Sequence, residues 1–414
     1  MKLVGKVYVI GGGLSGLSTA VNLVDSGLRV TLYESSSNLG GRCRSYFDKK
    51  LNQTIDNGNH LVLSGNEYVK KYLKKIGSHH SMWSPAKAEF PFFDLKTGQA
   101  WTMRPFSALS MISILNSSNR IPGSSIHEYM RVLKLMLARE KTVLDCVGGP
   151  GPLYKNFWEP LAVSVLNTEP ENASASLFWS VIKQIVLRGE KASKPMIAKK
   201  SLSDTFVEPA VRFLEQKRCK ILLNSHLTEM KFFKNKVVEI VVSGERIPIN
   251  DSEAIILALP ATLVSALLPK LKTPTEFRPI LNGHFKIPIN SEHPPLMGLT
   301  GGNAQWIFVR NGLASVTISA ATSYNDTKNN NLAQTLWGEI CLALGLNKVK
   351  LGPYRILKEK RATFLQSPQQ LKLRPGHKTQ WDNLSLAGDW IKTGLPATIE
   401  GSIKSGVIAS KQFI

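Results

Sequence analysis

Three glycines near the N-terminus, in the spacing G-x-G-x-x-G, are the residues whose chemistry can be inferred most directly. Gly11, Gly13 and Gly16 follow a short apolar run and open a segment with helical periodicity. We expect Gly11 to form a tight turn, Gly13 to admit a pyrophosphate close to the backbone, and Gly16 to let helix and strand pack closely. The pattern predicts a dinucleotide-binding unit.

An acidic residue completes this unit. The segment 29–33 has the character of a second strand, and Glu34 lies at its end. A carboxylate in this place can accept hydrogen bonds from the hydroxyl groups of a ribose. Because strand, glycines, helix, strand and acid occur in the required order, a nucleotide site is favoured over an ordinary β-α-β unit.

Two further glycine motifs favour a flavin over a nicotinamide. Gly40 and Gly41 would let the backbone pass close to a cofactor, and Arg42 would face its pyrophosphate. Near the C-terminus, a strand runs into Gly388 and Asp389, whose carboxylate can contact ribityl hydroxyls or a phosphate-bound water. We therefore expect FAD, held by both ends of the chain.

The helix after this last motif should begin near residues 395–398, with its backbone N–H groups facing a ring carbonyl of the flavin. In full, the residues expected to bind the cofactor are Gly11, Gly13, Leu14, Ser15, Gly16, Glu34, Gly40, Gly41, Arg42, Gly58, Leu227, Gly388, Asp389, Pro396, Ala397 and Thr398. No second G-x-G-x-x-G occurs, so the reductant would be either NAD(P)H acting directly or another protein.

The order of elements around these motifs indicates an α/β fold, α+β overall. It would consist of a Rossmann-type FAD-binding domain with an inserted substrate domain of mixed sheet and helices. We expect the FAD-binding domain to comprise 1–80, 201–265 and 376–414, and the substrate domain to comprise 81–200 and 266–375. Two domains agree with a length of 414 residues.

Helical stretches are expected in the substrate domain at 106–115 and 126–141. In the second, Met130, Leu133 and Leu137 would share one face, while basic residues supply positive charge. Such a face is typical of a helix packed on a core, but a basic amphipathic helix can also lie on a membrane surface. Both interpretations remain open.

Composition narrows the class of protein. Hydrophobic residues make up 43% and charged residues 20%, which is typical of globular proteins. No apolar run approaches the roughly 18–20 residues of a membrane span, and the early nucleotide unit leaves no room for a signal peptide. The four cysteines are far apart, which favours reduced thiols in a cytoplasm and no metal site.

The formal charge of +22 raises the question of an anionic partner. Its basic residues are scattered, and no nucleic-acid-binding module accompanies them, so we expect no nucleic acid. Attraction to an anionic membrane explains this charge at least as well. The expected location is cytoplasmic, with peripheral contact to the inner face of the membrane as an alternative.

Taken together, these motifs resemble the FAD-dependent amine oxidase and phytoene desaturase superfamily and, more narrowly, the hydroxysqualene dehydroxylase family. The matching segments span nearly the whole chain and lie at 11–16, 39–42, 56–60, 158–161, 166–168, 305–308, 361–364 and 386–401. The family usually has Gln in place of Asn59, a conservative difference, and commonly an acid in place of Val309. The role of that acid would be dispensable here or taken by a neighbour.

This resemblance implies reductive dehydroxylation in squalene and hopanoid biosynthesis. Hydride would reach an allylic carbon of hydroxysqualene while the hydroxyl group leaves as water. Loss of hydroxide requires protonation, and His60 and His284 are the first candidates for the acid, followed by Asp56 and Glu400. A purely structural role stays open for each histidine.

The implied substrate is a long apolar C30 isoprenoid, with Trp306 and Phe308 lining its pocket and aromatic faces stabilising an allylic cation. Implied contacts are a membrane surface and other enzymes of the squalene pathway. An oxidative carotenoid desaturase or amine oxidase is the alternative enzyme. An isoprenoid escort protein on the same fold is the alternative outside enzymes, although it would not need both flavin motifs.

Overall fold

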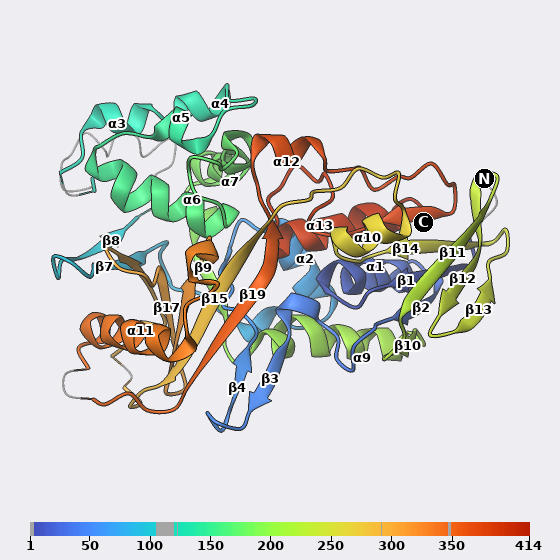
Figure 1. The fold of residues 1–414 in the computed structure, drawn as a ribbon, viewed down its shortest axis with the longest axis horizontal. Helices are drawn as coiled ribbons and strands as arrows, with labels where there is room; N and C mark the ends of the chain where they lie inside the picture. The colour runs from blue at the N-terminus through green and yellow to red at the C-terminus, as the bar shows by residue number, and fades with distance from the viewer. Residues whose placement is uncertain (1–3, 105–119, 122, 291, 347–348) are drawn as a thin grey trace.

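The computed structural model describes residues 4–104, 120–121, 123–290, 292–346 and 349–414 (Figure 1). The helix expected over 106–115 lies outside these residues. Two large sheets organise the described part of the chain, one at each side of the view in Figure 1.

The sheet that carries the N-terminal glycines is parallel throughout. Its five strands, in order across the sheet, are β10 (Lys220–Leu222), β2 (Arg29–Tyr33), β1 (Lys6–Ile10), β14 (Glu253–Leu257) and β20 (Leu384–Leu386). β1 and β14 are apolar and buried along almost their whole length, as a strand covered on both faces requires. The predicted Rossmann-type α/β fold is confirmed.

Two helices far apart in sequence pack closely beside this sheet. They are α1 (Leu14–Asp25) and α13 (Ile399–Ser410), which lie next to each other in Figure 1. Ser18 Oγ donates a hydrogen bond to the backbone oxygen of Ile403, at 3.0 Å. A Cβ at Gly406 would collide with the backbone oxygen of Ser15. Backbone therefore meets backbone at this crossing, and only glycine permits it.

The second sheet is mixed. Its seven strands, in order, are β19 (Tyr354–Phe364), β15 (Phe277–Lys286), β18 (Leu313–Ile318), β17 (Trp306–Arg310), β16 (Leu296–Thr300), β7 (Phe90–Asp94) and β8 (Ala100–Met103). Only the pairing of β16 with β7 is parallel in the described part of this sheet. β7 and β8 form an antiparallel pair at one edge of this sheet. One face packs on α11 (Asn329–Leu344), and the other packs on a layer of helices.

That helical layer contains α3 (Ile126–Met130), α4 (Leu133–Met136), α5 (Val143–Val147), a π-helical turn η5 (Tyr154–Trp158), α6 (Glu159–Leu166) and α7 (Ala175–Arg188). The smaller sheets comprise β3 (Ser45–Asp48) with β4 (Gln53–Asp56), β5 (Val62–Leu63) with β9 (Pro195–Ala198) and β6 (Met82–Trp83), and the antiparallel meander β11 (Leu227–Phe233), β12 (Lys236–Val242) and β13 (Glu245–Pro248). The remaining helices are α2 (Glu67–Lys75), α8 (Glu190–Ser193), α9 (Glu208–Gln216), α10 (Ala261–Leu267) and α12 (Pro368–Lys372), with the short turns η1 (Gly41–Cys43), η2 (His79–Ser81), η6 (Ser203–Val207) and η7 (Ala321–Tyr324).

The single helix predicted over 126–141 is wrong, because α3 and α4 are short and separate. The apolar face was also misassigned. The side chains actually buried are those of Tyr129, Val132 and Leu135. Met130 and Leu133 are each 46% exposed, and Leu137 is 86% exposed, so these three do not pack on the core. Among the described residues, no helix is both long and apolar enough to cross a bilayer.

The two large sheets also bear on how the chain divides into domains. Every strand of the five-stranded sheet comes from 1–80, 201–265 or 376–414, and every strand of the seven-stranded sheet comes from 81–200 or 266–375. We therefore propose for the folded protein the same two discontinuous domains that the sequence indicates.

The crossing of α1 and α13 generates a prediction about stability. Gly406→Ala should lower the free energy of unfolding by about 1–3 kcal/mol, because the new methyl group forces the two helices apart. Gly338→Ala is the matched control, since Gly338 is an exposed helical glycine of α11 with open space around its Cβ position. The control should raise stability by about 0.5–1 kcal/mol. Denaturant titration of both variants measures the free energy of unfolding. An equal change in the two variants would contradict the close crossing.

Candidate active site

A cavity of about 810 Å³ is lined by residues of both large sheets and of the helical layer. This volume is within the range of roughly 300–1,000 Å³ that is typical of small-molecule sites. Residues predicted to bind the cofactor that line it are Gly11, Gly13, Leu14, Ser15, Glu34, Gly40, Gly41, Arg42, Gly58, Gly388, Asp389, Pro396, Ala397 and Thr398. Motifs from both ends of the chain thus meet in one cavity.

Two of the predicted cofactor residues do not line this cavity. Gly16 packs instead, since a Cβ there would overlap the backbone oxygen of Gly11. This agrees with the close packing of helix and strand expected of it. Leu227 is 5% exposed and belongs to the apolar cluster of Tyr33 and Val242. Leu227 does not line the cavity, because its side chain at the start of β11 packs in the core. Its contact with the cofactor stays a prediction.

The acid at the end of β2 is held by backbone donors. Glu34 Oε2 accepts from the N–H of Gly12 at 2.7 Å, and Oε1 accepts from the N–H of Ser36 at 2.8 Å. These bonds orient the carboxylate where it also lines the cavity. A carboxylate fixed at this place can accept hydrogen bonds from ribose hydroxyls, as the sequence predicts.

The two remaining glycine motifs meet through an ion pair. Arg42 Nη2 lies 2.8 Å from Asp389 Oδ2, and Nη1 of the same guanidinium donates to the backbone oxygen of Ala362. The charge of Asp389 raises the pKa of Arg42 above its ordinary value. Sequence reasoning assigned each residue to the cofactor separately and did not pair them.

Two helix N-termini face the same cavity. Gly13 precedes α1, and Thr398 caps α13, where its Oγ1 accepts from the N–H of Gly401 at 3.2 Å. The N-terminus of a helix carries a partial positive charge and unpaired N–H groups, so it favours anions. Gly13 also leaves open space, since a Cβ there would meet nothing within 4 Å. The donor set and this space fit a dinucleotide with a pyrophosphate, that is, FAD.

Aromatic and aliphatic side chains form another part of the wall, including Phe90, Phe92, Phe157, Leu161, Trp306 and Phe308. Trp306 is held in place on two sides. Its Nε1 donates to Ser164 Oγ at 2.6 Å, and its ring meets the edge of Phe92 with centroids 5.5 Å apart. Both residues predicted for the substrate pocket, Trp306 and Phe308, lie in this wall, and their contact with substrate stays a prediction.

The two candidate histidines differ in the cavity that they line. His60 lines the large cavity, and burial lowers its pKa to about 4. His284 does not line that cavity; its Nδ1 lies 2.8 Å from Ser315 Oγ, and it faces a smaller cavity of about 30 Å³. Burial lowers the pKa of His284 to about 4 as well. Both imidazoles are therefore neutral at pH 7.

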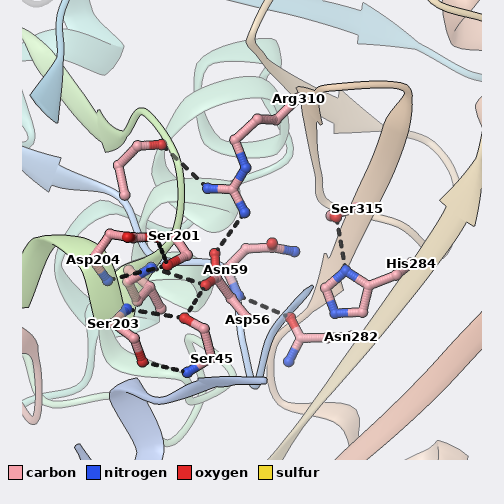
Figure 2. Close-up of polar contacts among 12 residues, drawn as sticks. Ser45, Asp56, Asn59, Ser201, Ser203, Asp204, Asn282, His284, Arg310 and Ser315 are labelled. Atoms are coloured by element: carbon pink, nitrogen blue, oxygen red, sulfur yellow. Dashed lines mark hydrogen bonds and ion pairs between the residues drawn. The ribbon is translucent and has the colours of Figure 1, made fainter. Parts of the chain in front are cut away.

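Asp56 is saturated by donors and does not line the large cavity. Its Oδ1 accepts from Ser45 Oγ at 2.6 Å and from the N–H of Leu202 at 2.9 Å. Its Oδ2 lies 2.9 Å from Nη2 of Arg310 (Figure 2). These contacts make Asp56 a structural anion that ties β4 to β17, and they place its carboxylate away from a substrate in the large cavity.

Glu400 is the acidic candidate that lines the large cavity. Its two oxygens accept from the N–H groups of Tyr68, at 3.1 Å, and Val69, at 2.8 Å, at the start of α2. Burial raises the pKa of Glu400, and those two hydrogen bonds oppose the rise. The net effect is a pKa above the ordinary value of a glutamate.

Position 309, where the family commonly has an acid, lies on β17 and borders the smaller cavity. Val309 is not among the residues of the large cavity. The Val309 side chain also packs against the apolar cluster that contains Leu336 of α11. Whether the role of the acid is dispensable or taken by a neighbour stays open.

Sequence reasoning missed a polar group in the cavity wall. Asn282 and Thr317 line the cavity together with Asn59, although they lie on the strands β15 and β18. Asn282 interrupts an otherwise apolar stretch of β15 and is 1% exposed. A buried amide in an apolar strand is the signal that could have singled it out.

Known proteins resemble this chain over nearly its full length. Residues 14–291 and 307–414 match the family described as flavin containing amine oxidoreductase. A hydroxysqualene dehydroxylase from Rhodopseudomonas palustris is 40% identical over 97% of this chain and 96% of its own length. Another from Sinorhizobium fredii is 39% identical over the same shares.

The fold is shared more widely. The crystal structure of a cyclohexylamine oxidase from Brevibacterium oxydans superimposes with a TM-score of 0.72, covering 99% of this chain and 98% of that one. Its sequence is 12% identical, so this likeness concerns the fold alone.

The open space at Gly13 generates a prediction about cofactor affinity. Gly13→Ala should leave the fold intact, because the backbone there has φ −72° and the methyl group meets no protein atom. The methyl group would occupy space at the helix N-terminus that a pyrophosphate needs, so FAD affinity should fall by about tenfold or more.

Equilibrium dialysis against FAD measures the affinity, and thermal unfolding without FAD verifies the fold. Gly376→Ala, at an exposed glycine with open space around it, is the control and should leave FAD affinity unchanged. Undiminished FAD affinity in Gly13→Ala would count against this placement of the pyrophosphate.

Proposed function

Because this chain belongs to the hydroxysqualene dehydroxylases, within the flavin-containing amine oxidoreductases, we propose that it converts hydroxysqualene to squalene. The protein is an FAD-dependent oxidoreductase. In the proposed reaction a carbon–oxygen bond breaks, a carbon–hydrogen bond forms, and one proton and one hydride are consumed as water leaves. FAD, when bound in reduced form, supplies the hydride.

The observation that carries this proposal is that one cavity joins both FAD motifs to an apolar aromatic wall. A long hydrocarbon with a single hydroxyl group requires such a wall for most of its length and polar groups at one place. Side chains that exclude water from this wall also protect a developing allylic cation from capture by solvent.

Trp306 is suited to stabilise that cation. Its indole is 8% exposed and is held by Ser164 and Phe92, so the ring cannot turn away from the cavity. A cation over an aromatic face is stabilised by about 0.5–2 kcal/mol, and by more where water is excluded.

For the acid, we propose Glu400. Both histidines predicted from sequence are neutral at pH 7, and His284 does not line the cavity. Glu400 lines it, and burial raises its pKa above the ordinary value of a glutamate. His60, in its neutral form, would donate a hydrogen bond within the same cavity and would not supply the proton.

We also propose that the surface formed by α3, α4 and Leu137 contacts a membrane, where an apolar substrate dissolves and other enzymes of the squalene pathway would act. Met130, Leu133 and Met136 are 46%, 46% and 55% exposed, and Leu137 is 86% exposed. Basic residues of the same segment include Arg131, Lys134, Arg139 and Lys141. Exposed apolar side chains among basic ones match the interface of an anionic bilayer.

The reaction is tested without knowledge of the natural donor, whether NAD(P)H or another protein. The protein is reduced anaerobically with dithionite, freed of excess reductant and mixed with hydroxysqualene. We expect squalene in an amount equal to the flavin that is reoxidised, measured by chromatography and absorbance. Flavin that stays reduced with no squalene would refute the proposal, and reduction of the oxidised flavin by a carotenoid precursor would favour the desaturase alternative. A purified protein that binds no FAD would favour the escort alternative.

Membrane contact is tested by flotation with vesicles that contain phosphatidylglycerol. Leu137→Asp should weaken binding by roughly tenfold, because one inserted leucine side chain contributes about 1.5–3 kcal/mol. Ile289→Asp is the matched control, since Ile289 is also 86% exposed but lies outside this surface. Equal weakening in the two variants, or no binding by the unaltered protein, would contradict the proposed contact.

A further inference from the structure

We propose that the amide of Asn282, oriented by Thr317 and Asn59, binds the hydroxyl group of the substrate and so distinguishes hydroxysqualene from squalene. This inference rests on the proposed function. It concerns a polar group that lines the cavity and whose three residues are neither among those predicted to bind the cofactor nor among the candidate acids.

Hydrogen bonds fix which way the Asn282 amide points. Thr317 Oγ1 donates to Asn282 Oδ1 at 2.9 Å. The backbone N–H of Asn59 reaches the same oxygen at 3.4 Å (Figure 2). A backbone N–H can only donate, so the atom that it meets must be the oxygen. The NH₂ group of Asn282 is consequently directed away from these partners.

Thr317 is itself oriented. Asn59 Nδ2 donates to Thr317 Oγ1 at 3.0 Å, which leaves the threonine proton directed at Asn282. The three side chains therefore form one chain of hydrogen bonds that ends on Asn282 Oδ1 and leaves the NH₂ group of this amide outside it. No described residue accepts a hydrogen bond from that group, although Asn282 as a whole is 1% exposed. Because Asn282 lines the large cavity, this donor is available to a ligand there.

Space in front of this donor is kept open by Gly58. A Cβ at Gly58 would lie 3.2 Å from Asn282 Nδ2, closer than an ordinary van der Waals contact. A ligand oxygen can therefore approach the amide where any other residue at position 58 would crowd it.

Strand register places this donor beside the aromatic wall. Asn282 pairs with Thr317 across β15 and β18, and Thr317 pairs with Trp306 across β18 and β17. Directly paired residues share one face of a sheet, with Cβ atoms about 4.5–5.5 Å apart. A hydroxyl group on the Asn282 amide thus holds the adjoining allylic carbons near the Trp306 ring. A neutral donor suits this role, because an amide does not change its charge over the pH range in which the protein is folded.

Once the hydroxyl group has left, squalene offers this amide no acceptor. A site that is built to bind a hydroxyl group discriminates strongly against the analogue that lacks it, since its own polar groups stay unpaired. The same donor that selects the substrate would therefore favour release of the product.

The test compares the affinities of the oxidised holoenzyme for hydroxysqualene and squalene, measured from changes in flavin absorbance. Oxidised protein has no hydride to transfer, so binding is measured without turnover. We expect the unaltered protein to prefer hydroxysqualene. In Asn282→Leu this preference should fall by at least about tenfold, with squalene affinity retained within about twofold.

Squalene affinity serves as the measure of an intact pocket, since squalene makes every apolar contact that the substrate makes. Thr317→Val, which frees the Asn282 amide to turn, should lower the preference several-fold. This variant tests the inference if Asn282→Leu does not fold. Thr363→Val is the control, because Thr363 also lines the cavity but hydrogen bonds to Asn167 and should leave the preference unchanged.

An unaltered preference in the folded variants would overturn the inference, as would a loss of FAD affinity in Asn282→Leu with the preference intact. Equal affinity of the unaltered protein for both ligands would also overturn it. That last result is separable from the proposed function, since squalene formation by the reduced protein is measured independently of binding preference.

Discussion

The close crossing of α1 and α13 is the contact on which the rest of this structure depends. It is possible because Gly406 lets backbone approach backbone at Ser15. The crossing holds the N-termini of both helices on one cavity, although they come from opposite ends of the chain. Two partial positive charges and the Arg42–Asp389 ion pair then converge where a pyrophosphate and a flavin would lie. The substrate domain adds its wall to a cofactor site that this crossing has already assembled.

Around that site, the paired charged side chains and the neutral polar side chains lie in different places. Asp56 is paired with Arg310 outside the large cavity, and Arg42 with Asp389 at the cofactor end. The groups beside the aromatic wall are neutral: His60 through burial, and the Asn59–Thr317–Asn282 group by its chemistry. A substrate that is almost entirely hydrocarbon suits such a cavity, because unpaired charges next to it would be costly to bury. The arrangement therefore agrees with an isoprenoid alcohol better than with a charged amine.

Much of the cofactor site was accessible from sequence because its requirements are local. Gly11, Gly13 and Gly16 are recognisable from their spacing, and each occupies the place that the spacing implies. The apolar face at 126–141 was misassigned because two sets of apolar residues there have helical spacing. One set contains Met130, Leu133 and Leu137 and the other Tyr129, Val132 and Leu135, and spacing alone cannot tell which set meets the core. Leu227 packs its side chain in the core, and its contact with the cofactor stays a prediction. Trp306 and Phe308 line the cavity, and their contact with substrate stays a prediction.

By itself the sequence determined the nucleotide unit, the second flavin motif and the family, because these depend on contiguous residues whose types are required by backbone geometry. Only the tertiary structure decided which candidates face the substrate. Asn282 and His284 lie two residues apart on β15, and hence on the same face of the strand, yet one lines the large cavity and the other the small one. Asn59, His60 and Phe308 border both cavities and divide them. That division arises from packing between segments more than two hundred residues apart, and no local pattern encodes it.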